Sequence, residues 1–266
     1  MIRPLPKPSP QIPLNHKVKR LPKGKPMTLV SGFRCSDGSI VLGADREQVG
    51  PFGKRSVEKL FRISTNQGLF LIGGAGRSSI ADNAMMRMEK ALTTAGANPN
   101  IVLADAHKDV IETILHEVHE EYIWGNRDEG NRTIQFIIAA ALEPNSAPFL
   151  YRTDEEIVYP QQLYACAGIG QDLAYYFADK LYNHHLSAEG AALISAFILR
   201  EVSQSVSGVG LGADLWVLHG KNRGLTRIPP NKVKELEVVI PDIEKAIADA
   251  WNGHIAIPEW LPKLFT

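Results

Sequence analysis

The chain has 266 residues, of which 44% are hydrophobic and 22% charged, and this composition predicts one large soluble domain with a sizeable core. Its formal net charge is zero, so no global charge points to nucleic acid or to a membrane surface. There is no apolar run of about 18 residues and no apolar signal-peptide core. The two cysteines, Cys35 and Cys166, lie in apolar strand-like sequence, which favours reduced thiols in a cytoplasmic protein over a disulfide framework.

The first 27 residues differ in kind from the rest. Residues 1–26 are rich in proline, lysine and arginine and contain no acidic residue, and a segment of this composition does not pack a core. We expect an extended tail with polyproline character. It could be a propeptide, a docking arm or a nucleic-acid tether, or else a solvated tail or a misplaced translation start.

Two apolar runs follow this tail. Residues 29–35 and 39–45 flank the turn Ser36-Asp37-Gly38, which predicts a hairpin. Thr28 then begins one strand and Asp45 ends its neighbour. Because the start of one strand lies beside the end of the other in an antiparallel pair, Thr28 and Asp45 should be close in space.

After a loop, two further short strands are expected over residues 59–63 and 69–72. The second runs into the glycine turn Gly73-Gly74-Ala75-Gly76. This turn and the later glycine-rich stretch 208–212 do not match a phosphate-binding loop, since neither has the GxxxxGK[ST] pattern.

The elements after the glycine turn also follow from periodicity and caps. Ser78 is a candidate cap for a first helix, and an apolar stripe runs along a second. A strand pair, a further strand ending in Gly168-Ile169-Gly170 and two more helices lead to a last strand. The expected helices cover residues 78–92, 100–124, 171–181 and 187–205, and the expected strands cover 133–142, 148–153, 162–167 and 213–218.

In these residues the chain resembles the proteasome-type N-terminal-nucleophile hydrolases. Thr28 stands where that family has its nucleophilic threonine, Asp45 at its acidic partner, and Lys59, in the phrase EKLFRI, at its catalytic lysine. Gly73 falls at the glycine whose backbone N–H donates to the oxyanion. The spacings differ from the family by one or two residues, in or beside loops where length changes cost little.

The chemistry of that family needs these residue types. A threonine hydroxyl is a poor nucleophile until a base takes its proton, and an N-terminal residue carries its own base in the α-amine. The amine has a pKa of about 7.7 to 8.0 in model peptides, so a useful fraction is neutral at cellular pH. A nearby lysine stabilises the developing alkoxide, an aspartate keeps that lysine charged, and a glycine N–H receives the oxyanion.

The resemblance implies a mixed α+β fold, a four-layer αββα sandwich covering residues 28–219, with an extension at 1–27 and an appendage at 220–266. It implies a threonine peptidase or amidohydrolase without a cofactor, acting on peptides or proteins. It also implies homo-oligomeric rings in the cytoplasm, and an ATP-dependent unfoldase is a candidate partner. Gln48, Val57, Leu71 and Ala75 would form the wall of the substrate pocket, which suggests hydrophobic side chains before the scissile bond.

Three features depart from the family pattern. Thr28 follows Met27 rather than a glycine, so the amine must be exposed by self-cleavage there, or by removal of Met27 if translation starts at that residue. Ile169 and Val206 replace a serine and an aspartate that normally support the nucleophile. The alternative interpretation is therefore an inactive structural subunit of a proteasome-like assembly, and small-molecule amidase action is a further possibility.

Two other segments suggest functions. His116 and His119 lie in the expected second helix with HExH spacing, which is not the HExxH zinc pattern, and we favour a polar helix face over a metal site. Near the C-terminus, residues 242–251 predict a short amphipathic helix and residues 255–265 are apolar. This appendage either docks on a neighbouring subunit or packs on its own domain.

Overall fold

The computed structural model describes residues 28–50, 53–66, 68–96, 103–124, 133–142, 147–220 and 224–254. The N-terminal 27 residues and residues 255–266, with the expectations attached to them, lie outside this described part. Within the described helices, none is long and apolar enough to cross a membrane.

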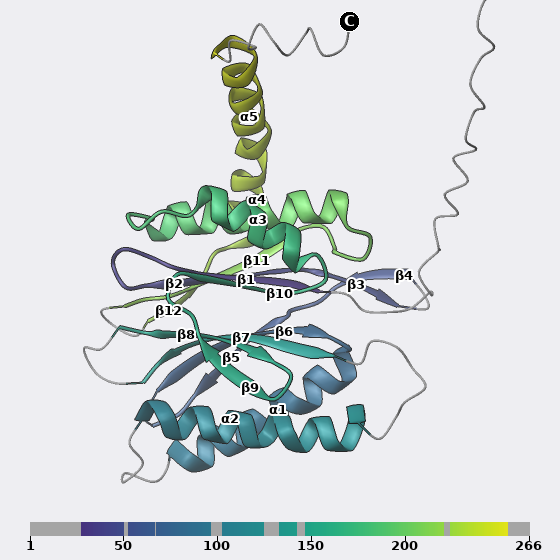
Figure 1. Cartoon of the computed structure of the whole chain (residues 1–266), viewed down its shortest axis with the longest axis vertical. Coiled ribbons are helices and arrows are strands. Elements are labelled where there is room, and N and C mark those ends of the chain that lie inside the picture. The colour runs from purple at the N-terminus through teal and green to yellow at the C-terminus, as the bar shows by residue number, and fades with distance from the viewer. Residues whose placement is uncertain are drawn as a thin grey trace, which may run out of the picture.

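The strand that follows Thr28 and the strand that ends at Asp45 belong to a five-stranded antiparallel sheet, which we call the upper sheet from its place in Figure 1. Its central pair is the expected hairpin, with Val30 opposite Ala44 and Arg34 opposite Ile40. The strand order is β10-β1-β2-β11-β12. The bounds are β1 Leu29–Arg34, β2 Ile40–Asp45, β10 Tyr164–Gly168, β11 Ala213–Leu218 and β12 Leu225–Arg227.

The second five-stranded sheet, the lower sheet, has the strand order β5-β6-β7-β8-β9. Lys59 directly precedes β5, and the glycine stretch Gly73–Gly76 is the end of β6. Its strands are β5 Leu60–Ser64, β6 Leu69–Gly76, β7 Ile134–Ala141, β8 Phe149–Asp154 and β9 Ile157–Pro160. Between β2 and β5, where we expected a loop, the chain forms a separate hairpin of β3 (Glu47–Gly50) and β4 (Gly53–Ser56). The sequences of these two strands, EQVG and GKRS, lack the alternation of apolar and polar residues by which hairpins are usually recognised.

Helices cover the outer face of each sheet, and this confirms the four-layer αββα sandwich (Figure 1). On the lower sheet lie α1 (Ser78–Gly96) and α2 (Leu103–His119), which continues as a π-helical turn at Glu120–Trp124. On the upper sheet lie α3 (Gln171–Leu181) and α4 (Ala188–Ser205). Ser187 caps α4 by accepting a hydrogen bond from the Gly190 N–H at 3.2 Å.

Strand alternation sorts the apolar side chains into the three spaces between these layers. On β6, Phe70 and Ile72 face α1 and α2, whereas Leu71 and Ala75 face the upper sheet. On β2, Val41 packs toward α4, while Ile40 and Leu42 face the lower sheet. The two sheets therefore share an apolar core, and Thr28, Asp45 and Lys59 lie at the strand ends that border it.

The last helix, α5 (Pro230–His254), is longer than the expected helix at 242–251 and starts on a proline, the residue best suited to a first helical position. It buries Val233 and Ile240 beside α4 and extends past the α3–α4 layer, away from the sheets (Figure 1). Pro241 lies inside it and cannot donate a hydrogen bond to the carbonyl of Glu237. Arg200 of α4 donates to that carbonyl through Nη1 at 2.9 Å, so the proline also marks where α5 is fastened to the body.

Candidate active site

Thr28 lies immediately before β1, and its backbone is held by the strands on both sides. The N–H of the following residue, Leu29, donates to Asp45 Oδ1 at 2.8 Å, while the Thr28 carbonyl accepts from the Ile169 N–H at 3.1 Å. Gly168 has φ +101°, and a Cβ there would lie 1.9 Å from the Thr28 carbonyl oxygen. Glycine is therefore required at 168 both for its conformation and for this close approach. Thr28 itself is 6% exposed.

Asp45 ends β2 and is fully buried, yet its carboxylate is well provided with donors. One oxygen accepts from Leu29, and the other accepts from Lys59 Nζ at 2.7 Å and from the Gly210 N–H at 3.0 Å. Burial raises the pKa of Asp45, and the Lys59 ammonium and the two backbone N–H groups act in the opposite direction. The aspartate is thus fixed in one orientation next to the peptide unit that begins with Thr28.

Gly210 is a part of this arrangement that the sequence did not indicate. The glycine-rich stretch 208–212 follows α4 and leads into β11, where Ala213 is paired with Asp45. The N–H of Arg46 also donates to the Gly212 carbonyl at 3.1 Å, so the stretch follows the end of β2 closely. Glycine-rich composition indicated a turn, but only the pairing of β2 with β11 shows which side chain the turn contacts.

Lys59 approaches Asp45 from the other sheet. It precedes β5, is 8% exposed, and its carbonyl accepts from the Gly74 N–H at 3.4 Å. Its ion pair with Asp45 therefore joins the ends of the two sheets across the shared core. Burying two charges is costly unless they are paired and hydrogen-bonded. Here the 2.7 Å contact between Lys59 and Asp45 and the two backbone N–H donors to Asp45 offset that cost.

Gly73 of β6 is paired with Leu60 of β5 and directly follows the apolar run at residues 69–72. A Cβ at this position would come 2.5 Å from Val30 Cγ1 of β1 and 2.9 Å from Leu60 Cδ2. Packing of the two sheets alone therefore demands glycine here.

The other residues expected to bind substrate are spread along neighbouring elements. Ala75 is 2% exposed, and its Cβ would lie 2.8 Å from a Cβ built at Gly168, so it adjoins the turn behind Thr28. Leu71 is fully buried in the core between the sheets. Val57 is partly exposed, and its N–H donates to the Arg46 carbonyl at 2.8 Å. Gln48 is in β3, and its side chain lies outside the described part.

The two apolar replacements, Ile169 and Val206, belong to one hydrophobic cluster. Val206 is the capping residue that follows α4, and its Cγ2 lies 3.2 Å from where a Cβ at Gly170 would stand. The turn after β10 and the end of α4 are thus joined by apolar contact, where the family pattern has polar side chains. Nearby, the Gly168 N–H donates to Gln135 Oε1 at 2.9 Å, a polar contact from β7 that sequence reasoning missed.

The sequence also did not indicate a second cluster of charged residues, formed by Arg227, Asp214 and Glu58. Arg227 of β12 donates to Asp214 through Nε at 2.9 Å and through Nη2 at 3.3 Å. Its Nη1 donates to Glu58, the neighbour of Lys59, at 2.6 Å, and the guanidinium lies over the Trp216 ring. No spacing in the sequence relates β12 to residue 58, so only the fold reveals this contact.

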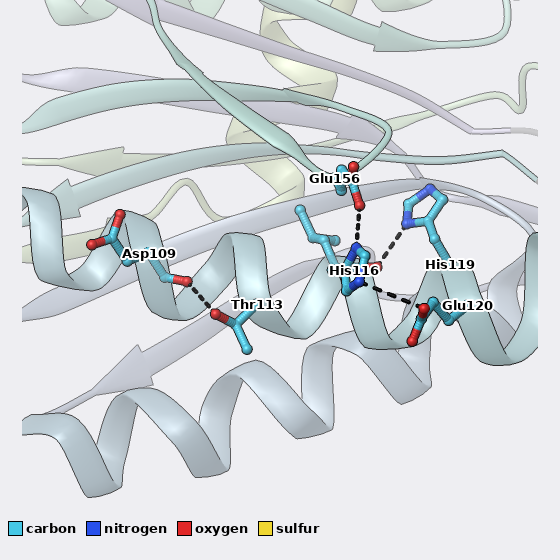
Figure 2. Close-up of polar contacts among 7 residues, drawn as sticks. Asp109, Thr113, His116, His119, Glu120 and Glu156 are labelled. Carbon is cyan, nitrogen blue, oxygen red and sulfur yellow. Dashed lines mark hydrogen bonds and ion pairs between the residues drawn. The ribbon is translucent and has the colours of Figure 1, made fainter.

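The two histidines of the second helix do not converge on a common point (Figure 2). His116 Nδ1 contacts Glu156 Oε2 at 2.6 Å and its Nε2 lies 3.7 Å from Glu120, whereas His119 Nδ1 contacts the Leu115 carbonyl of its own helix at 2.8 Å. The Glu156 contact raises the pKa of His116. Among the described residues, no group of three His, Cys, Asp or Glu side chains could hold a metal ion.

Comparison with known proteins agrees with this geometry. The family model described as "Proteasome subunit" matches residues 27–218, which is most of the chain. The chain belongs to the proteasome subunit family. This confirms the family that the sequence resembles, and the match ends at β11, before β12 and α5. A search of curated proteins found no significant match.

Solved structures of Anbu proteins have the same fold. Anbu, an ancestral beta-subunit, from Yersinia bercovieri aligns with a TM-score of 0.71 at 10% identity, covering 87% of this chain and 99% of that one. The helical assembly of the Anbu complex from Pseudomonas aeruginosa gives 0.71 at 14% identity, covering 87% and 98%. A Gly-1 mutant of Anbu from Hyphomicrobium sp. strain MC1 gives 0.69 at 16% identity, covering 86% and 99%. At these identities the likeness concerns the fold alone.

Proposed function

We propose that this member of the proteasome subunit family is a threonine-type peptidase or amidohydrolase with Thr28 as its nucleophile. The observation that carries the proposal is the buried Asp45–Lys59 pair, in which Asp45 also accepts from the amide that follows Thr28. Asp45 contacts both Lys59 and the amide that follows Thr28, and this supports the proposal that Lys59 is the positively charged partner of Thr28. An ordinary surface lysine and a strand-end cap would not be buried and connected in this way.

The reaction requires that Thr28 be the first residue, through self-cleavage after Met27 or removal of Met27. The free α-amine then takes the hydroxyl proton as Oγ1 attacks a carbonyl carbon, and the ammonium returns that proton to the departing amine. Lys59 stabilises the developing negative charge on Oγ1, and Asp45 keeps Lys59 protonated and in place. Water activated by the same amine cleaves the ester, which frees Thr28 and the acid.

Gly73 is the proposed donor to the oxyanion, and Gln48, Val57, Leu71 and Ala75 are the proposed pocket residues. The apolar side chains of Val57, Leu71 and Ala75 favour a hydrophobic residue before the scissile bond. We further propose self-association into rings in the cytoplasm, with an ATP-dependent unfoldase as a candidate partner. The assembly reported for the Pseudomonas aeruginosa Anbu complex supports self-association.

A second candidate, a non-catalytic subunit, is favoured by one observation. Ile169 and Val206, which both pack against the apolar cluster of the upper sheet and its helices, stand at positions where the resemblance places polar supports of a catalytic subunit. A peptide-hydrolysis assay separates the two candidates. The chain is produced so that it begins at Thr28, with Thr28→Ala as the inactive control and Thr28→Ser as a conservative one.

We expect cleavage of fluorogenic peptides with an apolar residue before the reporter group, retained in part by Thr28→Ser and lost in Thr28→Ala. Cleavage that Thr28→Ala retains would come from another site or a contaminant. Complete inactivity of a folded chain beginning at Thr28, toward peptides and small amides alike, would favour the non-catalytic subunit.

A further inference from the structure

Helix α5 has two sides of opposite character. The side toward α4 buries Val233 and Ile240, and Arg200 fastens it at Glu237. The opposite side is exposed and carries Val238, which at 73% is the most exposed large apolar side chain among the described residues. Surface valines occur singly in many proteins, so this exposure alone shows nothing.

The charged residues on either side of Val238 indicate what this face could bind. Lys234 and Asp242 lie one helical turn before and after Val238, and both are exposed. When two such helices lie antiparallel with Val238 on the twofold axis, Val238 meets its own copy. Lys234 of each helix then faces Asp242 of the other, twice.

The remaining exposed residues of the face agree with this register. Glu235 lies opposite Pro241, and Asn231 lies opposite Lys245, so no like charges oppose one another. A slip of one turn would place Asp242 against Val238 twice in one direction and Lys234 against Val238 twice in the other, so each slip loses both charge pairs. The pattern is thus self-complementary in one register, which is what a twofold interface requires.

We propose that the outer face of α5, made of Asn231, Lys234, Glu235, Val238, Asp242 and Lys245, is a dimer interface that binds α5 of a second copy in antiparallel orientation. The proposal concerns a contact beyond the family match at residue 218 and does not depend on catalysis by Thr28.

Sedimentation velocity over a concentration series tests the interface by measuring the step that doubles the mass. Lys234→Glu or Asp242→Lys alone should weaken this step roughly 5- to 30-fold, since each turns two attractions into two repulsions. The double variant Lys234→Glu/Asp242→Lys should return to within about threefold of the wild type, because the pairs are restored with their signs exchanged. Asp109→Lys on α2 is the control for a charge change on another surface.

Val238→Asp should lose the doubling step altogether, while its circular dichroism and melting stay close to wild type, as expected for an exposed position. The proposal is overturned if Val238→Asp associates as tightly as the wild type, or if the double variant is no tighter than the weaker single variant. It is also overturned if a chain ending at His254 associates more tightly than the full chain, since residues 255–266 would then cover the face in place of a second copy.

Discussion

Replacing Lys59 with methionine should show how strongly the site depends on its buried ion pair. Methionine keeps the length and removes the charge, which leaves the fully buried Asp45 with two backbone donors and no counter-ion. Breaking a buried pair in this way costs about 3–5 kcal/mol in the free energy of unfolding at neutral pH. This is a large part of the about 5–15 kcal/mol that stabilises a typical domain.

The loss should shrink as the pH falls. Lys59 lowers the pKa of Asp45 against the effect of burial, so its removal raises that pKa further. In the Lys59→Met variant the folded protein then binds a proton at a pH where the unfolded chain does not, and its stability decreases as pH rises through the raised pKa. The difference from wild type should therefore be largest near pH 8 and smaller near pH 5.

Urea unfolding of wild type, Lys59→Met, Asp45→Asn and the double variant, at matched protein concentration and at both pH values, measures this. The double variant should be more stable than the sum of the single losses predicts, because it carries no unpaired charge. A loss in Lys59→Met that is independent of pH, or single losses that simply add, would refute the reasoning.

Two further predictions concern packing and the fastening of α5. Gly73→Ala should lower the free energy of unfolding by about 1–3 kcal/mol, since its methyl group would meet Val30 at 2.5 Å; unchanged urea unfolding would contradict the packing argument. Arg200→Ala should destabilise the protein by about 1–3 kcal/mol by leaving the Glu237 carbonyl without its donor. Pro241→Ala should make that loss smaller by restoring a helical N–H, and an equal loss in both backgrounds in thermal melts would contradict the assignment.

The sequence was sufficient for most of the layers. The hairpin from Leu29 to Asp45 followed from one turn between two apolar runs, and α3 began and ended where its pattern predicted. The β3–β4 hairpin lacked such a pattern, and the length of α5 was hidden by Pro241, which normally ends a helix. The Glu237 carbonyl that Pro241 leaves without a helical donor is bonded by Arg200 of α4, and sequence spacing does not reveal this contact.

The site, too, was predicted in part from the sequence and in part seen only in the structure. Thr28, Asp45 and Lys59 were recognisable from the resemblance to the family in their order and spacing, and the predicted hairpin already placed Thr28 near Asp45. The structure brings Asp45 and Lys59 into contact and puts the Thr28–Leu29 amide on Asp45. Gly210 and Gln135 act through one backbone N–H and one side-chain amide across distant elements, so no local pattern pointed to either.

The most direct test of the catalytic claim is intact-mass spectrometry with a peptide epoxyketone, which forms a ring only with an adjacent free amine and hydroxyl. We predict one stoichiometric adduct on the chain that begins at Thr28, mapped to its first residue and absent both from Thr28→Ala and from a chain that keeps residues 1–27. Lys59→Met should react more slowly, because the developing alkoxide loses its positive neighbour. Absence of the adduct from a folded chain that begins at Thr28 would contradict the assignment of Thr28 as the nucleophile.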